Sequence, residues 1–362
     1  MIIKKIELKN YRNYDSLEIN FDSKTNILYG NNAQGKTNIL ESLYVCSTTK
    51  SHRTSKDIEL INFKSDEGHI KVFLEKAGKE YRIDIHLRKN KSKGIAINGI
   101  PIKKASELFG IFNVVFFSPE DLNIIKNGPA ERRKFVDMEL CQLDKIYVYN
   151  LMNYNKVLNQ RNQLLKDLYF RQDLKDTLDI WDEQLVSYGI NVIKKREEFI
   201  QKINKIIKPI HEKLTDGKEQ IDIIYNKNCN ENHLLEELLK NREKDIKYKT
   251  TSIGPHRDDI LIFSNEINVR TYGSQGQQRT AALSLKLAEI ELVKELINDK
   301  PVLLLDDVLS ELDSNRQNHL LQKINEIQTI ITCTGLDEFI ENRFSINKVF
   351  QVKEGQVEER TV

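Results

Sequence analysis

The sequence lacks the features of a disulfide-bonded, membrane-spanning or exported protein. It has four cysteines in 362 residues. They are scattered and no two have metal-binding spacing, so disulfides and zinc are both disfavoured and a reducing compartment fits. No apolar run approaches the roughly 18 residues that cross a bilayer. The first residues alternate and carry charge, which predicts a strand and not a signal peptide. We therefore expect a cytoplasmic protein with no membrane partner.

An excess of charge of one sign is also missing. The chain has 56 Lys and Arg against 54 Asp and Glu, a net charge of +2 and a pI of about 8.1. It is not a polycation, so any nucleic-acid binding must come from local patches. The length allows two or three domains with a substantial core. We see no low-complexity linker and no internal repeat.

The hydrophobic pattern of the first two thirds changes from strand-like to helical. Residues 1–29 predict three short strands, and alternation over 70–102 includes a hairpin with an Asn98-Gly99 turn. From about 131 to 215, apolar residues recur every three, four or seven positions, and glycine is almost absent. This pattern predicts a helical insertion, read as an antiparallel pair that is broken near 171–176.

The last third returns to strands and helices. Strands are predicted near 220–224, 260–263, 302–305 and 329–332. The expected fold class is therefore α/β: a head with a mixed sheet, formed by residues 1–120 and 250–362, plus a mainly helical second lobe over 121–249.

Residues 30–37, Gly-Asn-Asn-Ala-Gln-Gly-Lys-Thr, match the phosphate-binding loop pattern. They follow a predicted strand and open a helix predicted from about Gly35 to Val45, which is the context such a loop requires. The glycines allow a tight turn with N–H groups around the β-phosphate, Lys36 reaches the β- and γ-oxygens, and the Thr37 hydroxyl ligates Mg²⁺. An accidental match is the alternative. The predicted ATP-binding residues here are Gly30, Asn31, Asn32, Ala33, Gln34, Gly35, Lys36 and Thr37.

Two aspartates end the predicted buried strand at 302–305. Asp306 would hold Mg²⁺, directly or through a water, and Asp307 would polarise the water that attacks the γ-phosphate. Related ATPases more often have a glutamate at the second place. Aspartate is one methylene shorter, so we expect slow hydrolysis. The predicted catalytic residues are Lys36, Asp306 and Asp307; the alternative is a strand end with two solvated acids.

A polar segment, Ser274-Gln275-Gly276-Gln277, precedes a predicted amphipathic helix about 30 residues before the aspartates. Ser274 would lie at the helix N-terminus, where free N–H groups and the helix dipole favour an anion. An ordinary polar N-cap is the alternative. The segment resembles the LSGGQ signature of ABC-type ATPases, which contacts the γ-phosphate bound by the partner subunit. Ser310 and Asp313 likewise resemble the D-loop, which crosses the dimer seam.

The whole chain resembles the RecF family of bacterial recombination and repair ATPases. The segments that carry this resemblance are Asn10-Tyr11-Arg12-Asn13-Tyr14, Phe117-Ser118-Pro119-Glu120-Asp121-Leu122, residues 128–135 and Gly254-Pro255-His256-Arg257-Asp258-Asp259. No single one would decide it, but their order and spacing are very specific. The resemblance adds Arg12 to the expected ATP-binding residues.

The resemblance implies an ABC-type head, an ATP-dependent homodimer on DNA and weak, DNA-stimulated ATP hydrolysis with Mg²⁺. It also implies work with RecR and RecO, which helps RecA replace single-strand-binding protein at gaps, supports replication restart and supports SOS induction. The DNA could be single-stranded, duplex or a gap junction.

Two positions depart from the ABC pattern. Transporters carry a histidine after the strand that follows the magnesium segment, whereas this chain has Thr332-Cys333-Thr334, so a hydroxyl must serve or nothing does. No obvious segment matches the loop that supplies a glutamine to Mg²⁺ in ABC-type ATPases. Ser118 to Asp121 is its best location.

Six basic residues are candidates for DNA contacts: Arg53, Lys89, Lys91, Lys93, Arg132 and Arg133. Phosphate contacts need cations and little sequence logic, so binding would be nonspecific and sensitive to salt. Solvated charged faces are the alternative.

Three other functions fit the motifs less well. SMC-type ATPases carry far longer coiled coils between the two motif halves than this chain allows. Transporter subunits place the signature about a hundred residues after the phosphate loop and keep the histidine. A binding module in which ATP only joins two subunits stays open, because of Asp307 and the missing histidine.

Overall fold

The structure is a computed structural model that describes residues 1–324, 327–335 and 346–360. The chain forms two compact units: a head unit, Met1–Asp121 with Glu289–Val362, and an inserted unit, Leu122–Ala288. We expected the head to resume at residue 250. Residues 250–288 instead belong to the inserted unit, because the strand at Asp259–Ser264 hydrogen-bonds to the strand at Ile221–Asn226.

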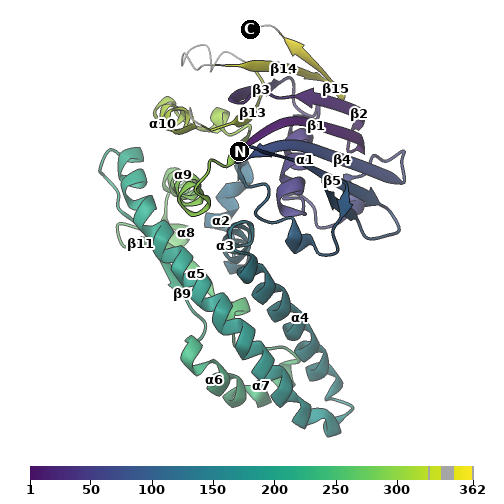
Figure 1. Cartoon of the computed structure of the whole chain (residues 1–362). Coiled ribbons are helices and arrows are strands. Elements are labelled where there is room, and N and C mark those ends of the chain that lie inside the picture. The colour runs from purple at the N-terminus through teal and green to yellow at the C-terminus, as the bar shows by residue number, and fades with distance from the viewer. Residues whose placement is uncertain (325–326, 336–345, 361–362) are drawn as a thin grey trace. The chain divides into compact units, whose positions relative to one another are not determined.

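One sheet of the head unit carries the strands that surround the phosphate loop (Figure 1). Its order is β15-β14-β3-β13-β12-β8, and all neighbours pair in parallel except β14 with β15. The bounds are β3 Thr25–Tyr29, β8 Val114–Phe117, β12 Val302–Asp306, β13 Thr329–Cys333, β14 Lys348–Lys353 and β15 Gln356–Arg360. Every residue of β8, β12 and β13 is buried, as expected for strands covered on both faces. Parallel pairing brings the carboxyl ends of these strands to one edge.

The other sheet of the head unit is an antiparallel meander in the order β2-β1-β4-β5-β6-β7. Its bounds are β1 Ile2–Tyr11, β2 Tyr14–Asn20, β4 Glu67–Lys76, β5 Lys79–Arg88, β6 Gly94–Ile97 and β7 Ile100–Pro101. The predicted hairpin is confirmed: Asn98 (φ 52°) and Gly99 (φ 80°) turn the chain, and Pro101 lies on the edge strand. Helix α1, Lys36–Thr48, contacts strands of both sheets, which joins them into one core.

The inserted unit is built on a pair of long antiparallel helices, α4 and α5 (Figure 1). Its helices are α2 Leu122–Lys126, α3 Pro129–Leu143, α4 Lys145–Asp167, α5 Leu178–Leu214, α6 Leu234–Lys240, α7 Arg242–Tyr248, α8 Val269–Tyr272 and the first part of α9 Gln275–Ile297. A small sheet contains β9 Ile221–Asn226, β10 Asp259–Ser264 and β11 Ile267–Asn268. The predicted helical insertion and its break are confirmed, since a 3-10 helix at Gln172–Thr177 separates α4 from α5.

A buried ion-pair cluster links three helices of the inserted unit. Arg161 on α4 is fully buried and pairs with Asp182 on α5 at 2.6 Å and with Asp245 on α7 at 2.8 Å. Its guanidinium also donates to the Thr251 hydroxyl at 2.8 Å. Because a buried charge is tolerated only when it is paired and hydrogen-bonded, this cluster fixes the register of the three helices.

The prediction of an amphipathic α9 was wrong in one respect. Residues 281–290 are all buried, and these include the polar Ser284, Lys286 and Glu289. In the described part of the chain, no helix combines the length and the apolar character that a bilayer crossing requires.

Candidate nucleotide-binding site

The phosphate loop lies between β3 and α1, as predicted. It leaves the carboxyl end of β3, and the Gly30 N–H donates to the carbonyl oxygen of Cys333 on β13 at 3.3 Å. Gly30 has φ 152°, and a Cβ there would lie 2.3 Å from the carbonyl oxygen of Val352. Gly35 has φ 111°, and a Cβ there would lie 2.6 Å from the Tyr14 hydroxyl. Both positions therefore require glycine, for conformation and for space.

The Lys36 side chain crosses the loop. Its ammonium donates to the carbonyl oxygens of Gly30 at 2.6 Å and Asn31 at 2.9 Å. Burial lowers the pKa of Lys36, and the nearby Asp307 and Asp306 carboxylates oppose that shift. The ammonium is thus held above the loop opening as a point charge, where β- and γ-phosphate oxygens can replace the carbonyls as its acceptors.

The predicted magnesium pair is brought together by the fold. The Thr37 hydroxyl donates to Oδ1 of Asp306 at 2.9 Å, although the two residues are 269 positions apart. The Thr332 hydroxyl of β13 donates to the same oxygen at 2.7 Å. Burial raises the pKa of Asp306, while the hydrogen bonds from Thr332 and Thr37 lower it. A hydroxyl and a carboxylate beside a phosphate loop are the oxygen ligands that Mg²⁺ prefers, so the residues fit that ion.

Asp307 turns out of the strand with φ 53°, in the left-handed region that Asp tolerates. Its N–H donates to the Thr332 hydroxyl at 3.0 Å, and its carbonyl oxygen accepts from the Ser310 hydroxyl at 2.9 Å. The side chain is half-buried. Thr332, in the stretch that we matched to the transporter histidine, therefore uses its hydroxyl to hold both aspartates of this segment.

The best location for the glutamine-loop equivalent also reaches this edge. Strand β8 pairs with β12, with Phe117 beside Leu305, so Ser118 follows next to Asp306 in the register. Ser118 is buried, and its N–H donates to the Asp121 carboxylate at 2.9 Å. The segment is thus placed at the carboxyl end of the sheet, without a glutamine.

Arg12 is held against α1. Its guanidinium donates twice to the buried carboxylate of Glu41, at 2.8 and 2.7 Å, and once to the carbonyl oxygen of Glu59 at 2.8 Å. Three of the five guanidinium N–H groups are therefore engaged, which leaves two for any nucleotide. Its described contacts fix α1 beside the turn between β1 and β2.

Sequence reasoning missed the residues that brace the phosphate loop from two hairpin turns. The Asn13 side chain donates to the carbonyl oxygen of Gln34 at 3.1 Å and accepts from Asn38 at 2.7 Å. The Gln34 side chain accepts from the Glu354 N–H at 2.6 Å, in the turn between β14 and β15. The segment at residues 10–14 was noted only for its resemblance, and no local pattern ties the turn at 354 to the loop.

The D-loop candidates lie directly after the aspartates. Ser310 is exposed in a 3-10 helix, Leu309–Glu311, and Asp313 caps α10, Ser314–Ile324, by accepting from the Arg316 N–H at 3.0 Å. The Asp313 carboxylate also pairs with the Arg316 guanidinium at 2.7 Å.

The signature candidates begin α9 in the inserted unit. Ser274, Gln275 and Gly276 are exposed. The Ser274 N–H donates to the Gln277 side chain at 2.9 Å, and the Gln277 N–H donates to the Ser274 hydroxyl at 3.2 Å. This reciprocal arrangement is a capping box. It holds the exposed start of the helix in a fixed shape.

The Gly-Pro-His-Arg-Asp-Asp segment acts inside the inserted unit. The His256 ring contacts the Tyr154 hydroxyl at 2.6 Å and the carbonyl oxygen of Thr251 at 3.0 Å. Burial lowers the pKa of His256 to about 4. The Arg257 guanidinium donates to the carbonyl oxygen of Thr251 at 3.0 Å. These contacts are architectural.

The six candidates for DNA binding differ in exposure. Lys91 and Arg53 are exposed, but Arg53 donates to the Asn38 side chain at 3.0 Å and lies 4.0 Å from a Glu41 carboxylate oxygen. Lys89 pairs with Asp66 at 2.9 Å and Lys93 pairs with Asp57 at 2.9 Å. Arg132 is a correction: its side chain is 3% exposed, and it binds both oxygens of Asp259 at 2.7 and 3.0 Å. Its charge is therefore not available to phosphates. Arg133 is half-buried and donates to the carbonyl oxygen of Asp258 at 2.6 Å.

Comparison with known proteins decides the family. The family model described as "RecF/RecN/SMC N terminal domain" matches residues 2–358. The chain is 65% identical to the DNA replication and repair protein RecF of Lachnospira eligens and 63% identical to that of Agathobacter rectalis, over 99% of each chain. The chain belongs to the RecF family.

Solved structures agree with this assignment. The structure described as the recombination mediator protein RecF-ATP in the RecFOR pathway matches with a TM-score of 0.93 and 37% identity, over 99% of this chain and 98% of that one. An Smc head domain from Pyrococcus furiosus matches with a TM-score of 0.58 at 17% identity, which shows the shared fold. The α/β head of this RecF-family chain is thus the ABC-type ATPase fold of RecF and SMC proteins, as predicted.

Proposed function

We propose that this RecF-family chain is an ATP-switched DNA-binding protein of replication and repair. It would bind ATP and Mg²⁺, form a homodimer on DNA, hydrolyse ATP slowly with stimulation by DNA, and act in the cytoplasm with RecR and RecO to load RecA at single-strand gaps. Support for replication restart and SOS induction belongs to the same proposal. The ATP-bound RecF structure at 37% identity supports the nucleotide.

The observation that carries the proposal is the contact between Thr37 and Asp306. Their oxygens lie 2.9 Å apart at the edge of the sheet where the phosphate loop begins. Bound Mg²⁺ would neutralise charge that develops on the transferred phosphoryl group. The chain itself would supply Thr37 and Asp306 as ligands, Lys36 as the cation on the β- and γ-oxygens, and the loop N–H groups as donors.

Hydrolysis would be slow because Asp307, the residue that would polarise the attacking water, is poorly suited to that role. The Asp307 carboxylate is short, and its backbone is fixed by Thr332 and Ser310. The Thr332 hydroxyl already donates to Asp306, so it is not free to stabilise the γ-phosphate as a histidine would. Little general-base or electrostatic help therefore remains from the chain's own site.

The missing help is proposed to come from a second copy. Ser274 and its capping box would present a helix N-terminus to the γ-phosphate on the partner, with Ser310 and Asp313 at the seam. Exposed cations such as Lys91 and Arg53 would contact DNA phosphates. The other candidates, Lys89, Lys93 and Arg133, would have to exchange their present partners for phosphate.

Two substitutions test the shared site. Lys36→Met should abolish ATP binding, because it removes the ammonium above the loop. Ser274→Arg should leave ATP binding intact but block dimerisation and hydrolysis, because it fills the exposed cap with a long cation. The measurements are nucleotide binding, and size in solution with ATP, ADP or no nucleotide, each with and without DNA. Normal ATP-dependent dimers of Ser274→Arg would refute the shared-site mechanism.

A second function is favoured by the same features that slow hydrolysis. In this alternative ATP only joins the two subunits. Phosphate release in the presence of DNA distinguishes them: many turnovers per site support an ATPase, whereas release that never exceeds one per site supports a nucleotide-dependent binding module.

A further inference from the structure

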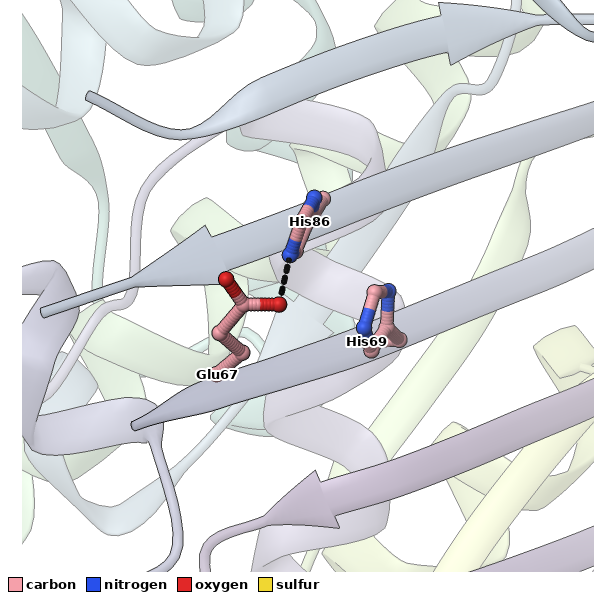
Figure 2. A group of neighbouring side chains, drawn as sticks. All are labelled: Glu67, His69 and His86. Carbon is pink, nitrogen blue, oxygen red and sulfur yellow. Dashed lines mark hydrogen bonds and ion pairs between the residues drawn. The ribbon is translucent and has the colours of Figure 1, made fainter. Parts of the chain in front are cut away.

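Two histidines and a glutamate meet on the outer face of the antiparallel sheet of the head unit, away from the phosphate loop in sequence. Glu67 and His69 are two residues apart on β4, so they share one face of the strand. His86 on β5 pairs directly with His69 across the strands. Figure 2 shows the three side chains on these two neighbouring strands. The register of a regular hairpin therefore brings them together.

Their donor atoms are close enough for one ion. His86 Nε2 lies 2.9 Å from Glu67 Oε2, and the imidazole rings of His69 and His86 stack with centroids 4.2 Å apart. One ligand atom from each of the three residues lies within 4.8 Å of the other two. Donors around a tetrahedral Zn²⁺ are about 3.3 Å apart, from bonds of about 2.0–2.1 Å. The difference is at most about 1.5 Å, and rotations of the half-exposed side chains that move their donor atoms by that distance would close it.

We propose that Glu67, His69 and His86 form a binding site for a divalent transition-metal ion, Zn²⁺ above all. Two imidazoles and one carboxylate are a ligand set that suits Zn²⁺ and not Mg²⁺ or Ca²⁺, which prefer oxygen ligands. Three protein ligands leave the fourth position to water or to a ligand from another molecule.

The surroundings leave room for such an ion and limit its affinity. Gly94 of β6 pairs with His86 on the far side and has no side chain of its own; a Cβ there would meet the His86 Cβ at 3.8 Å and the Arg88 guanidinium at 4.0 Å. Glu67 and His86 have side chains that are 55% and 35% exposed, so an ion can enter from solvent. Lys9 of β1 pairs with His69, and Lys71 follows on the same face of β4. The positive charges of these two lysines repel a bound metal ion, so we expect the ion to bind more weakly than in a closed four-ligand site.

The scattered cysteines take no part in this site. Cysteine spacing disfavours a thiolate zinc site, but imidazoles and carboxylates contributed by two strands leave no short spacing in the sequence. The Glu-x-His pair at 67–69 became meaningful only when the register placed His86 beside it.

The test measures Zn²⁺ bound per chain in the full-length protein without a histidine tag, with excess Mg²⁺ present to occupy the Thr37–Asp306 pair. After dialysis against Zn²⁺, the wild type should hold one more Zn²⁺ than a His69→Ala, His86→Ala double variant. Each single histidine variant should bind Zn²⁺ at least about tenfold to a hundredfold more weakly, which is the loss that even an outer-shell partner causes.

A matched control is His233→Ala. His233 contacts Glu236 at 3.3 Å on an exposed helix start but has no second histidine in the cluster. This variant should keep the wild-type Zn²⁺ content. Added Zn²⁺ should also raise the unfolding midpoint of the wild type and of His233→Ala, but not of the double variant.

The proposal fails if the wild type retains no Zn²⁺ beyond the double variant, or if His233→Ala loses as much as the single variants do. Circular dichroism and ATP binding show whether the double variant is misfolded. If it is, the double variant Glu67→Gln, His86→Gln takes its place, because it keeps polar side chains of similar size. The same criteria then apply to that variant. Because ATP binding is measured separately, failure here is distinguishable from failure of the proposed ATP-dependent function.

Discussion

Replacement of Thr332 by valine should weaken the head unit more than its small change in shape suggests. Valine keeps the volume but removes the hydroxyl, which donates to Asp306 at 2.7 Å and accepts from the Asp307 N–H at 3.0 Å. Thr332 is 2% exposed, so water cannot easily replace the lost group. The change leaves Asp306 with Thr37 as its remaining hydroxyl donor among the described contacts.

The magnitude follows from the two lost hydrogen bonds. A hydrogen bond to a charged group contributes about 1.5–3 kcal/mol, and a buried N–H left unpaired costs about 1–3 kcal/mol. The two terms share one hydroxyl and are not fully additive, so we expect the free energy of unfolding to fall by about 2–4 kcal/mol. Nucleotide affinity should fall as well, because Asp306 and the start of the segment at Asp307 lose their common anchor.

Denaturant unfolding with and without MgATP provides the assay, and Thr332→Ser is the matched control because it keeps the hydroxyl. Serine lacks one methyl group, which costs about 0.8 kcal/mol. If the valine and serine variants unfold at the same denaturant concentration and bind ATP equally, the hydroxyl does not anchor the two aspartates and the reasoning is wrong.

Three further outcomes follow from the structure. His256 is buried, and its pKa is lowered from 6.5 to about 4. The free energy of unfolding should therefore be highest above pH 6.5 and should fall by up to about 3 kcal/mol as the pH falls from 6.5 toward 4. Urea titrations should show a smaller loss for His256→Gln, whereas His233→Gln should behave like the wild type. Arg161→Met removes the cation shared by two buried aspartates, of which Asp182 keeps Arg242 at 2.6 Å and Asp245 keeps the Ser252 hydroxyl at 2.6 Å. It should destabilise the inserted unit by about 3 kcal/mol, the low end of the range for breaking a buried pair, measured by calorimetry; an unchanged transition would contradict the buried-pair argument. Lys91→Glu should weaken DNA binding at every sequence and make the affinity depend less steeply on salt concentration, as measured by fluorescence anisotropy titrations. Lys240→Glu is the control, because it makes the same charge change elsewhere on the surface. Equal losses of DNA affinity in the two variants would argue against a DNA contact by Lys91.

Much of the nucleotide site could be predicted because its chemistry is local. The phosphate loop needs glycines at fixed places and a lysine and threonine directly after them, so eight consecutive residues contain the pattern. The strand before Asp306 is recognisable because a strand covered on both faces must be apolar. The helical insertion is recognisable because its apolar residues keep a helical period over two long helices.

The DNA candidates were less predictable because charge in a sequence does not show its partner. Arg132 stands in a basic run, but the fold buries it on Asp259, 127 residues away. Runs of basic residues and buried ion pairs look alike until the partner is known.

The sequence by itself determined that this chain has the phosphate-loop pattern, an apolar strand that ends at Asp306 and the ordered motifs of its family, because each of these is written in neighbouring residues. Only the tertiary structure decided which hydroxyls reach Asp306, which hairpin turns brace the loop, and that Glu67, His69 and His86 share one face. Parallel pairing and strand register bring together side chains that are tens or hundreds of residues apart in the sequence. A local sequence pattern does not show which of these distant residues become neighbours.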